Sequence, residues 1–81
     1  MRDLFIGDAV RSTAGHDRGA LLLVIEVTED RVTVVDGRTR KLSAPKKKNR
    51  RHLRFAGRTE LLGVPESDAI VRALLAQFAN K

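Results

Sequence analysis

A run of cations without a single acid occupies the middle of the chain. Ten of the sixteen lysines and arginines lie between Arg38 and Arg58, and this window contains no Asp or Glu. The window therefore carries a charge of +10, while the rest of the chain, with six basic and ten acidic residues, carries −4. Such a concentration of positive charge repels itself unless an anion lies against it. The pattern predicts phosphate binding, because a nucleic-acid backbone presents one phosphate at each residue of a strand.

The basic window differs from a charged tail because apolar residues are spaced through it. Leu42, Leu53 and Phe55 alternate with the cations, and Pro45 stands before a run of lysines. Segments made only of charge stay disordered, since they bury no apolar area. We expect a folded basic surface with a mobile loop at residues 46–49. A solvated charged face without a partner and a basic targeting signal are the alternative interpretations.

Side chains with catalytic or metal-binding chemistry are few. Ser12, His16 and Asp17 could suggest a hydrolytic set, but nothing marks Ser12 as an exposed nucleophile with an oxyanion hole. The chain has two histidines, far apart, and no cysteine, which argues against a metal site. The sequence contains no P-loop and no dinucleotide fingerprint. We therefore predict that the protein is not an enzyme, uses no metal or cofactor and binds no small-molecule substrate.

Length and composition indicate one small domain. A chain of 81 residues, 42% of them hydrophobic, buries little more than half of its unfolded surface, so its stability is expected to be modest. The absence of cysteine excludes disulfides and favours a reducing compartment. The first ten residues lack the apolar core of an export signal, and the longest apolar run, residues 20–25, is too short to cross a bilayer. We expect a cytoplasmic protein that does not bind membranes.

Short strands joined by tight turns account for most of the chain. Apolar and polar residues alternate in several segments, and the most apolar segment is expected to be buried on both faces at its start. Gly15 and Gly19, with an Asp between them, indicate a tight turn, and Asp36-Gly37 is a hairpin dipeptide. The strand candidates are residues 8–14, 21–28, 31–35, 38–44, 50–55 and, as a short piece, 58–62.

One helix is predicted at about residues 67–80. Ser67 suits the N-cap, and Asp68 places negative charge in the first turn. The strands and this helix together predict a mainly β fold, a small barrel of five to six antiparallel strands with the helix closing an end or side. No repeat or linker is visible, so residues 1–81 are expected to form a single domain. One apolar stripe of the helix is expected in the core: Ile70, Val71, Leu74, Leu75 and Phe78.

The glycine-bounded turn and its flanking strands resemble the KOW motif, which forms part of an SH3-like barrel. The likeness continues through Asp36-Gly37-Arg38, Lys41-Leu42, residues 45–49 and His52-Leu53. Over residues 7–53 the chain is similar to small bacterial KOW-domain RNA-binding proteins and to a KOW-type large-subunit ribosomal protein of archaea and eukaryotes. The residues that carry the motif match are Gly7, Asp8, Val10, Ser12, Gly15, Asp17, Gly19, Val24 and Val27.

The resemblance implies an SH3-like barrel that binds structured RNA, ribosomal RNA above all, through the KOW loop and the adjacent basic segment. Gly15 and Gly19 would let backbone N–H groups approach a phosphate, and the guanidinium of Arg18 matches phosphate geometry. The lysine run would add point charges, and His52 would stack on a base or bind a 2′-hydroxyl. The implied RNA-binding residues are Arg11, Ser12, Gly15, His16, Arg18, Gly19, Arg40, Lys41, Lys46, Lys47, Lys48, Asn49, Arg50, Arg51, His52 and Arg54.

The aromatic content favours folded RNA over single strands. The chain has no Trp or Tyr, and Phe5, Phe55 and Phe78 all fit the apolar pattern, with Leu4 and Ile6 as further expected core contacts. Single-stranded bases stack on exposed rings, whereas folded RNA is bound through its shape and phosphates.

Other readings of the same residues stay open. KOW domains of transcription elongation factors resemble this chain and can dock on polymerase or ribosomal proteins, so a protein-interaction module is the alternative function. DNA binding is disfavoured because the chain has no recognition helix, since the apolar face of its one helix belongs to the core.

The acids are expected to have structural roles. Asp17 is expected to stabilise its turn, because a carboxylate repels phosphate, and the acids near Glu29-Asp30 would keep the other side of the protein off the RNA. The sequence leaves open which RNA is bound, whether binding is permanent or transient, and the oligomeric state.

Overall fold

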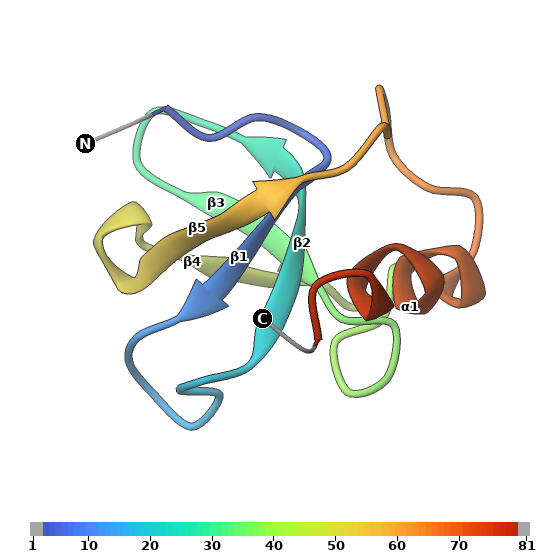
Figure 1. Ribbon diagram of the computed structural model, residues 1–81. Helices are drawn as coiled ribbons and strands as arrows, with labels where there is room; N and C mark the ends of the chain where they lie inside the picture. Colours follow the sequence, from blue (N-terminus) through green and yellow to red (C-terminus); the bar gives the residue numbers. More distant parts are fainter. Residues whose placement is uncertain (1–2, 80–81) are drawn as a thin grey trace.

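The computed structural model describes residues 3–79, which form an antiparallel sheet and one α-helix (Figure 1). The sheet has five strands in the order β4-β3-β2-β1-β5. The mainly β fold with one C-terminal helix, consistent with a small SH3-like barrel, is therefore confirmed. In chain order the elements are β1 (Asp8–Ser12), β2 (Leu21–Val27), β3 (Val32–Val35), β4 (Lys46–Lys48), the 3₁₀ turn η1 (Arg50–His52), β5 (Leu53–Arg58) and α1 (Asp68–Ala76).

The sheet is strongly curved, because a very short connection joins its two edge strands. Only residues 49–52 separate β4 from β5, and three of them form η1 (Figure 1). A 3₁₀ turn rises about 2 Å per residue, so this connection spans roughly 13 Å at most. A flat five-stranded sheet would be about 19 Å wide. The edges must therefore approach each other, and register shifts at Ala9/Val10 and at Val24/Glu26 supply part of the bend.

Both faces of the central strands are buried, each in its own apolar cluster. Leu22 and Leu23 are neighbours on β2, point to opposite faces and are both fully buried, as expected for the start of this strand. One cluster, inside the curve of the sheet, is formed by Leu4, Val10, Leu22, Val24, Val32 and Val34. The other, under the helix, is formed by Ala9, Leu23, Ile25, Val35, Val71, Leu75 and Phe78.

The helix begins where the sequence predicts and ends earlier. The side-chain oxygen of Ser67 accepts a hydrogen bond from the backbone N–H of Ile70 at 3.2 Å, which confirms the N-cap. Val71, Leu75 and Phe78 form a buried row on the sheet, but Ile70 is 40% exposed, so its assignment to the core was wrong. Regular α-helix stops at Ala76, and residue 80, the expected end, lies outside the described residues.

The basic window folds differently from the prediction. Residues 38–44 form turns instead of a strand, and residues 46–48, the expected mobile loop, form β4 against β3. The side chain of Asp36 explains the first difference, because its Oδ1 accepts the backbone N–H groups of Arg38 and Arg40, each at 2.8 Å. Such a side-chain acceptor competes with a strand ladder for the same donors. Similarly, β5 ends at Arg58, so residues 59–62 add no strand.

The N-terminal segment is only partly buried. Leu4 is in the core, but Phe5 is 55% exposed and Ile6 is 39% exposed, so the expectation that both contact the core was wrong. A tight turn causes this, since the Asp8 carboxylate accepts the backbone N–H of Phe5 at 2.9 Å and turns its ring outward. The guanidinium of Arg58 lies 5.5 Å from the centre of that ring, in a cation–π contact.

The helix braces the connection between β3 and β4. The guanidinium of Arg72 donates to the backbone oxygen of Gly37 at 2.7 Å, and the Asp68 carboxylate accepts the backbone N–H of Leu42 at 2.8 Å. Gly37 has a φ of 78°, and a Cβ atom there would lie 2.6 Å from the backbone oxygen of Asp68. Only glycine therefore allows the connection and the helix to approach so closely.

Replacing Gly37 with alanine should test this packing. We expect Gly37→Ala to lower the free energy of unfolding by about 1 to 3 kcal/mol, because it adds backbone strain and a clash. Urea denaturation followed by circular dichroism measures the change. Gly63→Ala is the matched control, since a Cβ atom at Gly63 meets nothing within 4 Å, and it should change stability by less than about 0.5 kcal/mol. Equal losses of stability in Gly37→Ala and Gly63→Ala would contradict the close packing of the helix on the β3–β4 connection.

Candidate nucleic-acid interface

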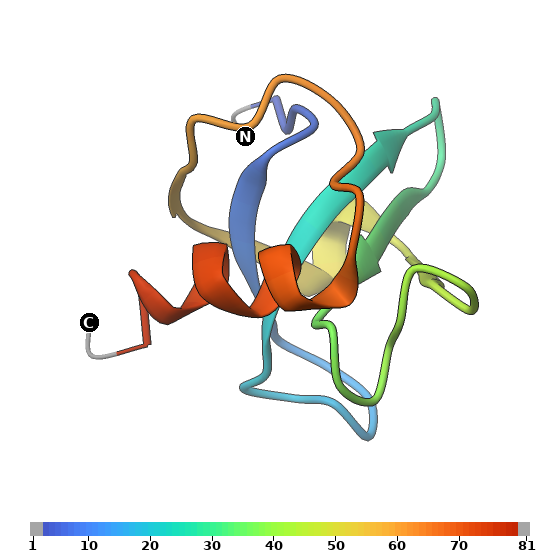
Figure 2. The ribbon, with the colours of Figure 1, turned by 90° about the vertical axis from the view of Figure 1, so that its right-hand side faces the viewer.

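Two connections of the sheet lie at the same end of the molecule. Residues 13–20, which we call the glycine loop, join β1 to β2, and residues 36–45 join β3 to β4. Because β3 runs antiparallel to β2 and Val35 pairs with Leu23, β3 ends beside the start of β2. Figure 2 shows both connections projecting from the lower end of the sheet. A cleft of about 270 Å³ separates them, lined on one side by His16 and Asp17 and on the other by Thr39 and Arg40.

The η1 turn lies against the other side of the glycine loop. The backbone N–H of Thr13 donates to the backbone oxygen of His52 at 2.8 Å, and Ser12 pairs with Leu53 in the β1–β5 ladder. We call residues 11–20 and 36–54 the basic end, because they contain eleven lysines and arginines and only two acids. The fold therefore gathers most of the basic window around the glycine loop.

The two acids of the basic end are used internally. Asp36 accepts backbone hydrogen bonds within its own turn. Asp17 forms an ion pair with Lys48, with 2.7 Å between its Oδ1 and the Lys48 Nζ. Asp17 thus stabilises its loop, as expected, and neither acid pairs with one of the exposed cations of this end within residues 3–79.

Lys48 is a structural residue and has little contact with solvent. Only 7% of it is exposed, and its ammonium group also donates to the Ser12 hydroxyl at 2.9 Å and to the Ala14 backbone oxygen at 3.1 Å. The Ser12 hydroxyl lies 2.8 Å from Asp17 Oδ1. The expectation of Lys48 as a point charge on a mobile loop was therefore wrong, because Asp17, 31 residues earlier, holds it inside the molecule.

The pKa of Asp17 reflects this contact. Burial by itself raises the pKa of the carboxyl, but the hydrogen bonds from Lys48 and Ser12 and the charge of the ammonium group lower it. The lowering effects prevail, and the pKa of Asp17 lies below its ordinary value. The Asp17 side chain is therefore a carboxylate at neutral pH.

The other predicted RNA-binding residues, except Ser12, lie at or near the surface. Gly15 and Gly19 have φ angles of 84° and 89°, as their turn requires. Ser12 is buried, whereas the side chains of five predicted residues are partly exposed: Arg11, Arg40, Lys46, Asn49 and Arg50. The exposed ones are His16, Arg18, Lys41, Lys47, Arg51, His52 and Arg54.

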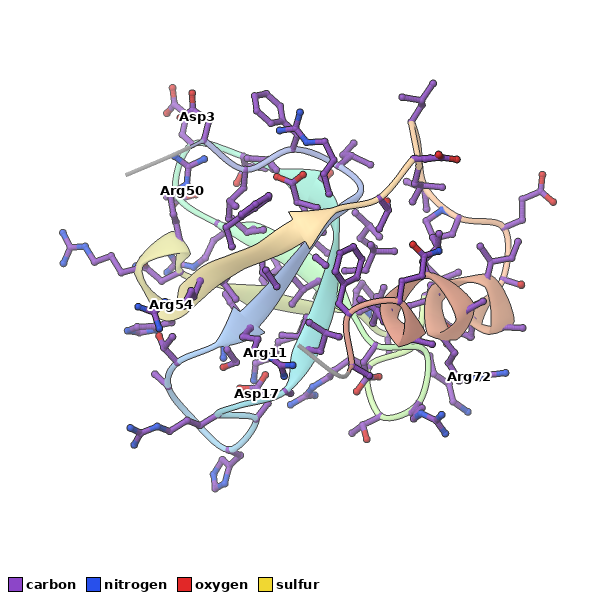
Figure 3. All side chains as sticks on the ribbon, viewed as in Figure 1. Asp3, Arg11, Asp17, Arg50, Arg54 and Arg72 are labelled. Carbon is purple, nitrogen blue, oxygen red and sulfur yellow. The ribbon has the colours of Figure 1, made fainter. Side chains whose placement is uncertain are left out.

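Asn49 and Arg50 have local partners. The Asn49 side chain accepts the backbone N–H of Arg51 at 2.9 Å and so caps η1. The Arg50 guanidinium lies 3.6 Å from the Asp3 carboxylate, and Figure 3 shows the two side chains together beside the N-terminal segment. Arg38 is exposed in the β3–β4 connection and was missing from the predicted site, although its position inside the basic window was a signal for it.

Two arginines face each other on adjacent strands. Arg11 on β1 is directly opposite Arg54 on β5 in the ladder, and neither belongs to an ion pair among residues 3–79. Arg11 instead donates to the backbone oxygen of Gly19 at 3.0 Å. A groove of about 180 Å³ lies between these arginines and Phe78. Like charges directly opposite in a sheet destabilise it, so an anion bound here would remove a repulsion.

The comparisons assign no family to this arrangement. No family model matches the chain, and no curated protein matches it. Among residues 3–79 the structure contains no group of three or more metal-ligating side chains, and α1 is neither long nor apolar enough to cross a membrane. The resemblance to KOW proteins therefore depends on the residues that carry it in the sequence.

A double-mutant cycle should measure the coupling between Lys48 and Asp17. Lys48→Met and Asp17→Asn should each lower the free energy of unfolding by about 3 kcal/mol, because each leaves a buried charge without its partner. The double variant should be about 1 to 3 kcal/mol more stable than the two single changes predict by addition. Urea denaturation of the four proteins gives these values. Additive effects would mean that the two side chains do not stabilise each other.

The Asp17 carboxyl should also make stability depend on pH. Its pKa is lower in the folded chain, so the unfolded chain takes up the proton first as the pH falls. The contribution of the ion pair is therefore complete above the ordinary pKa of 3.8 and is lost progressively below it. In urea denaturation, the parent should lose more stability than Asp17→Asn on acidification below about pH 4. If the difference in the free energy of unfolding between the parent and Asp17→Asn stays constant with pH, this prediction is refuted.

Proposed function

We propose that the protein is a non-catalytic RNA-binding protein, whose basic end neutralises the phosphates of a folded RNA. The facing position of Arg11 and Arg54 is the observation on which this proposal rests. They lie opposite each other on adjacent strands, without an acid as partner within residues 3–79. A phosphate has the charge and the acceptor oxygens that two guanidinium groups bind most strongly.

The surroundings of these arginines support a larger polyanion as the ligand, in preference to an isolated phosphate. Arg18, Lys47 and Arg51 are exposed on three separate segments of the basic end. A nucleic-acid backbone engages several such cations at once and releases a counterion for each phosphate that is neutralised. The glycine loop adds backbone N–H groups that no Cβ atom shields at Gly15 and Gly19.

Folded RNA fits this surface better than single-stranded RNA or duplex DNA. The basic end contains no Phe, Trp or Tyr on which bases would stack, and its exposed rings are the imidazoles of His16 and His52. Arg72, the one basic residue of α1 within residues 3–79, donates to Gly37, so the helix offers no basic face to a DNA groove. Loops that contact phosphates and sugars are typical of proteins that bind RNA by shape.

The resemblance to KOW-type ribosomal proteins supports ribosomal RNA as the target and the cytoplasm as the place of action. The Lys48–Asp17 ion pair suits this role, because it orders the glycine loop before binding. An interface that is already ordered loses less conformational entropy when its partner binds.

RNA affinity measured against salt concentration tests the proposal. A labelled RNA stem-loop is titrated with the parent and with the variant Arg11→Gln/Arg54→Gln, by fluorescence anisotropy. Two lost phosphate contacts should weaken binding and make the slope of log K against log salt less negative by about 1.4 to 1.8. The variant should remain folded, since the change removes a repulsion between the strands and loses one exposed hydrogen bond, from Arg11 to Gly19.

Arg31→Gln is the matched control, because Arg31 is an exposed arginine in the β2–β3 turn, outside the basic end. It should leave the slope and affinity close to those of the parent. A slope that is unchanged in the double variant would show that the facing arginines do not bind phosphate. Tighter binding to single-stranded poly(U) than to the stem-loop would contradict the preference for folded RNA.

A further inference from the structure

Most of the exposed apolar side chains gather far from the basic end. Among residues 3–79, the large hydrophobic side chains that are exposed belong to five residues, and four of these lie in two neighbouring segments. Phe5 is 55% exposed and Ile6 39%, while Leu62 is 97% exposed and Val64 59%. We call residues 4–6 and 61–64, together with Val27, the apolar end. A cluster of this kind on a small domain is typical of an interaction site.

The apolar end is hollowed. One cleft of about 380 Å³ is lined by Leu4, Phe5, Ile6, Val27, Leu61 and Leu62. A second cleft of about 240 Å³ shares four of these residues, Phe5, Ile6, Leu61 and Leu62, and continues to Arg58. The two clefts form one shallow, open apolar surface against which side chains of a partner can pack.

Strand direction places this surface opposite the glycine loop, while Arg50 of the basic end reaches the N-terminal segment at Asp3. In the β1–β5 ladder Asp8 pairs with Arg58, so residues 3–7 and 59–66 meet at the start of β1, and the glycine loop follows its end. Figure 1 shows the N-terminal segment and the connection from β5 to α1 at the top of the molecule, with the glycine loop at the bottom. A bound RNA at the basic end would therefore leave the apolar end accessible.

The apolar end is preformed. The Thr59 hydroxyl donates to the backbone oxygen of Gly7 at 2.6 Å, and the backbone N–H of Gly7 donates to the oxygen of Val24 at 2.9 Å. Gly7 has a φ of 95°, and a Cβ atom there would lie 2.5 Å from the backbone oxygen of Leu61. Glycine at this position thus lets the two apolar segments pack side by side, so little ordering is needed on binding.

Negative charge surrounds the apolar end. Residues 3–8, 26–31 and 58–66 contain seven acids and two arginines. One of these arginines, Arg58, lies over the Phe5 ring and 3.4 Å from the buried carboxylate of Asp8. The exposed acids include Glu29 and Glu60, and Asp3 is exposed as well but lies 3.6 Å from the guanidinium of Arg50. This charge repels a nucleic acid and attracts a cationic partner.

We propose that the apolar end docks a basic segment of a second protein, with large aliphatic side chains that enter the clefts and lysines or arginines that meet the acidic rim. A second copy of this chain fits less well. Two apolar ends would bring like charges together, and the basic end has no exposed large apolar residue with which to fill the clefts. The protein would then join a folded RNA to a basic protein, which goes beyond RNA binding alone.

A random peptide library displayed on phage identifies the preferred occupant. The library is selected on the immobilised parent protein and counter-selected on Leu62→Ser, a change at a side chain so exposed that folding should not suffer. We expect the enriched peptides to combine two or more large aliphatic residues with a net positive charge. Phe5→Ser/Leu62→Ser should weaken binding of such a peptide at least about tenfold. Glu60→Lys should weaken it too, mainly at low salt.

Ile70→Ser is the matched control, since Ile70 is the exposed apolar residue that lies on α1, outside the apolar end. It should bind the peptide like the parent. The proposal is overturned if no peptide distinguishes the parent from Leu62→Ser, or if the enriched peptides are neutral or acidic. It is also overturned if sedimentation shows that the parent self-associates through Leu62, because the occupant would then be a second copy.

Measurements of both ligands on the same variants separate this proposal from RNA binding. Leu62→Ser should bind the RNA stem-loop like the parent, and Arg11→Gln/Arg54→Gln should bind the selected peptide like the parent. Loss of peptide binding in the arginine variant would place the peptide on the basic end and refute the docking surface, whatever the outcome for RNA.

Discussion

The ion pair between Lys48 and Asp17 is the contact on which the shape of the basic end depends. It joins the edge strand β4 to the glycine loop, and the Ser12 hydroxyl connects both side chains to the end of β1. β4 consists of three lysines, and the glycine loop contributes only Ala20 to the packing of the core, so hydrophobic packing does little to hold either segment in place. Charge-assisted hydrogen bonds in a buried site therefore hold β4 and the glycine loop together. The same contact removes one cation and one acid from the surface and leaves the remaining cations without acidic neighbours in the loop.

Antiparallel pairing separates the chain into two ends of different chemistry. β2 runs antiparallel to both β1 and β3, so the connections before and after it lie at opposite ends of the sheet. The connections on either side of β2 illustrate this, since the glycine loop precedes it and the acidic turn at Glu29 and Asp30 follows it. The helix reinforces the separation, because Asp68 and Arg72 hold the β3–β4 connection at the basic end. A phosphate surface and a surface for a basic protein can therefore coexist on one small molecule without competing.

The sequence by itself determined the elements that local chemistry controls. Alternation and β-branched residues predicted the three central strands, since one face of each must be apolar. Ser67 predicted the start of the helix, because its side chain accepts a backbone N–H that the helix leaves unpaired. Gly15 and Gly19 predicted positive φ angles, which other residues avoid. The excess of cations between Arg38 and Arg58 is likewise a property of the sequence alone.

Tertiary structure decided which of those cations reach the solvent. Lys46, Lys47 and Lys48 are identical in the sequence, but only Lys48 lies within reach of Asp17, and a contact between residues so far apart leaves no local pattern. The facing position of Arg11 and Arg54 depends on the register of β1 with β5, which a bulge at Ala9 and Val10 shifts by one residue. The exposed ring of Phe5 depends on the carboxylate of Asp8, which ties the turn before β1 and directs the ring outward. Contacts between residues far apart in the sequence and the register of the strands therefore decide which charged and apolar side chains share a surface. The order of charged and apolar residues along the chain does not specify where each side chain points.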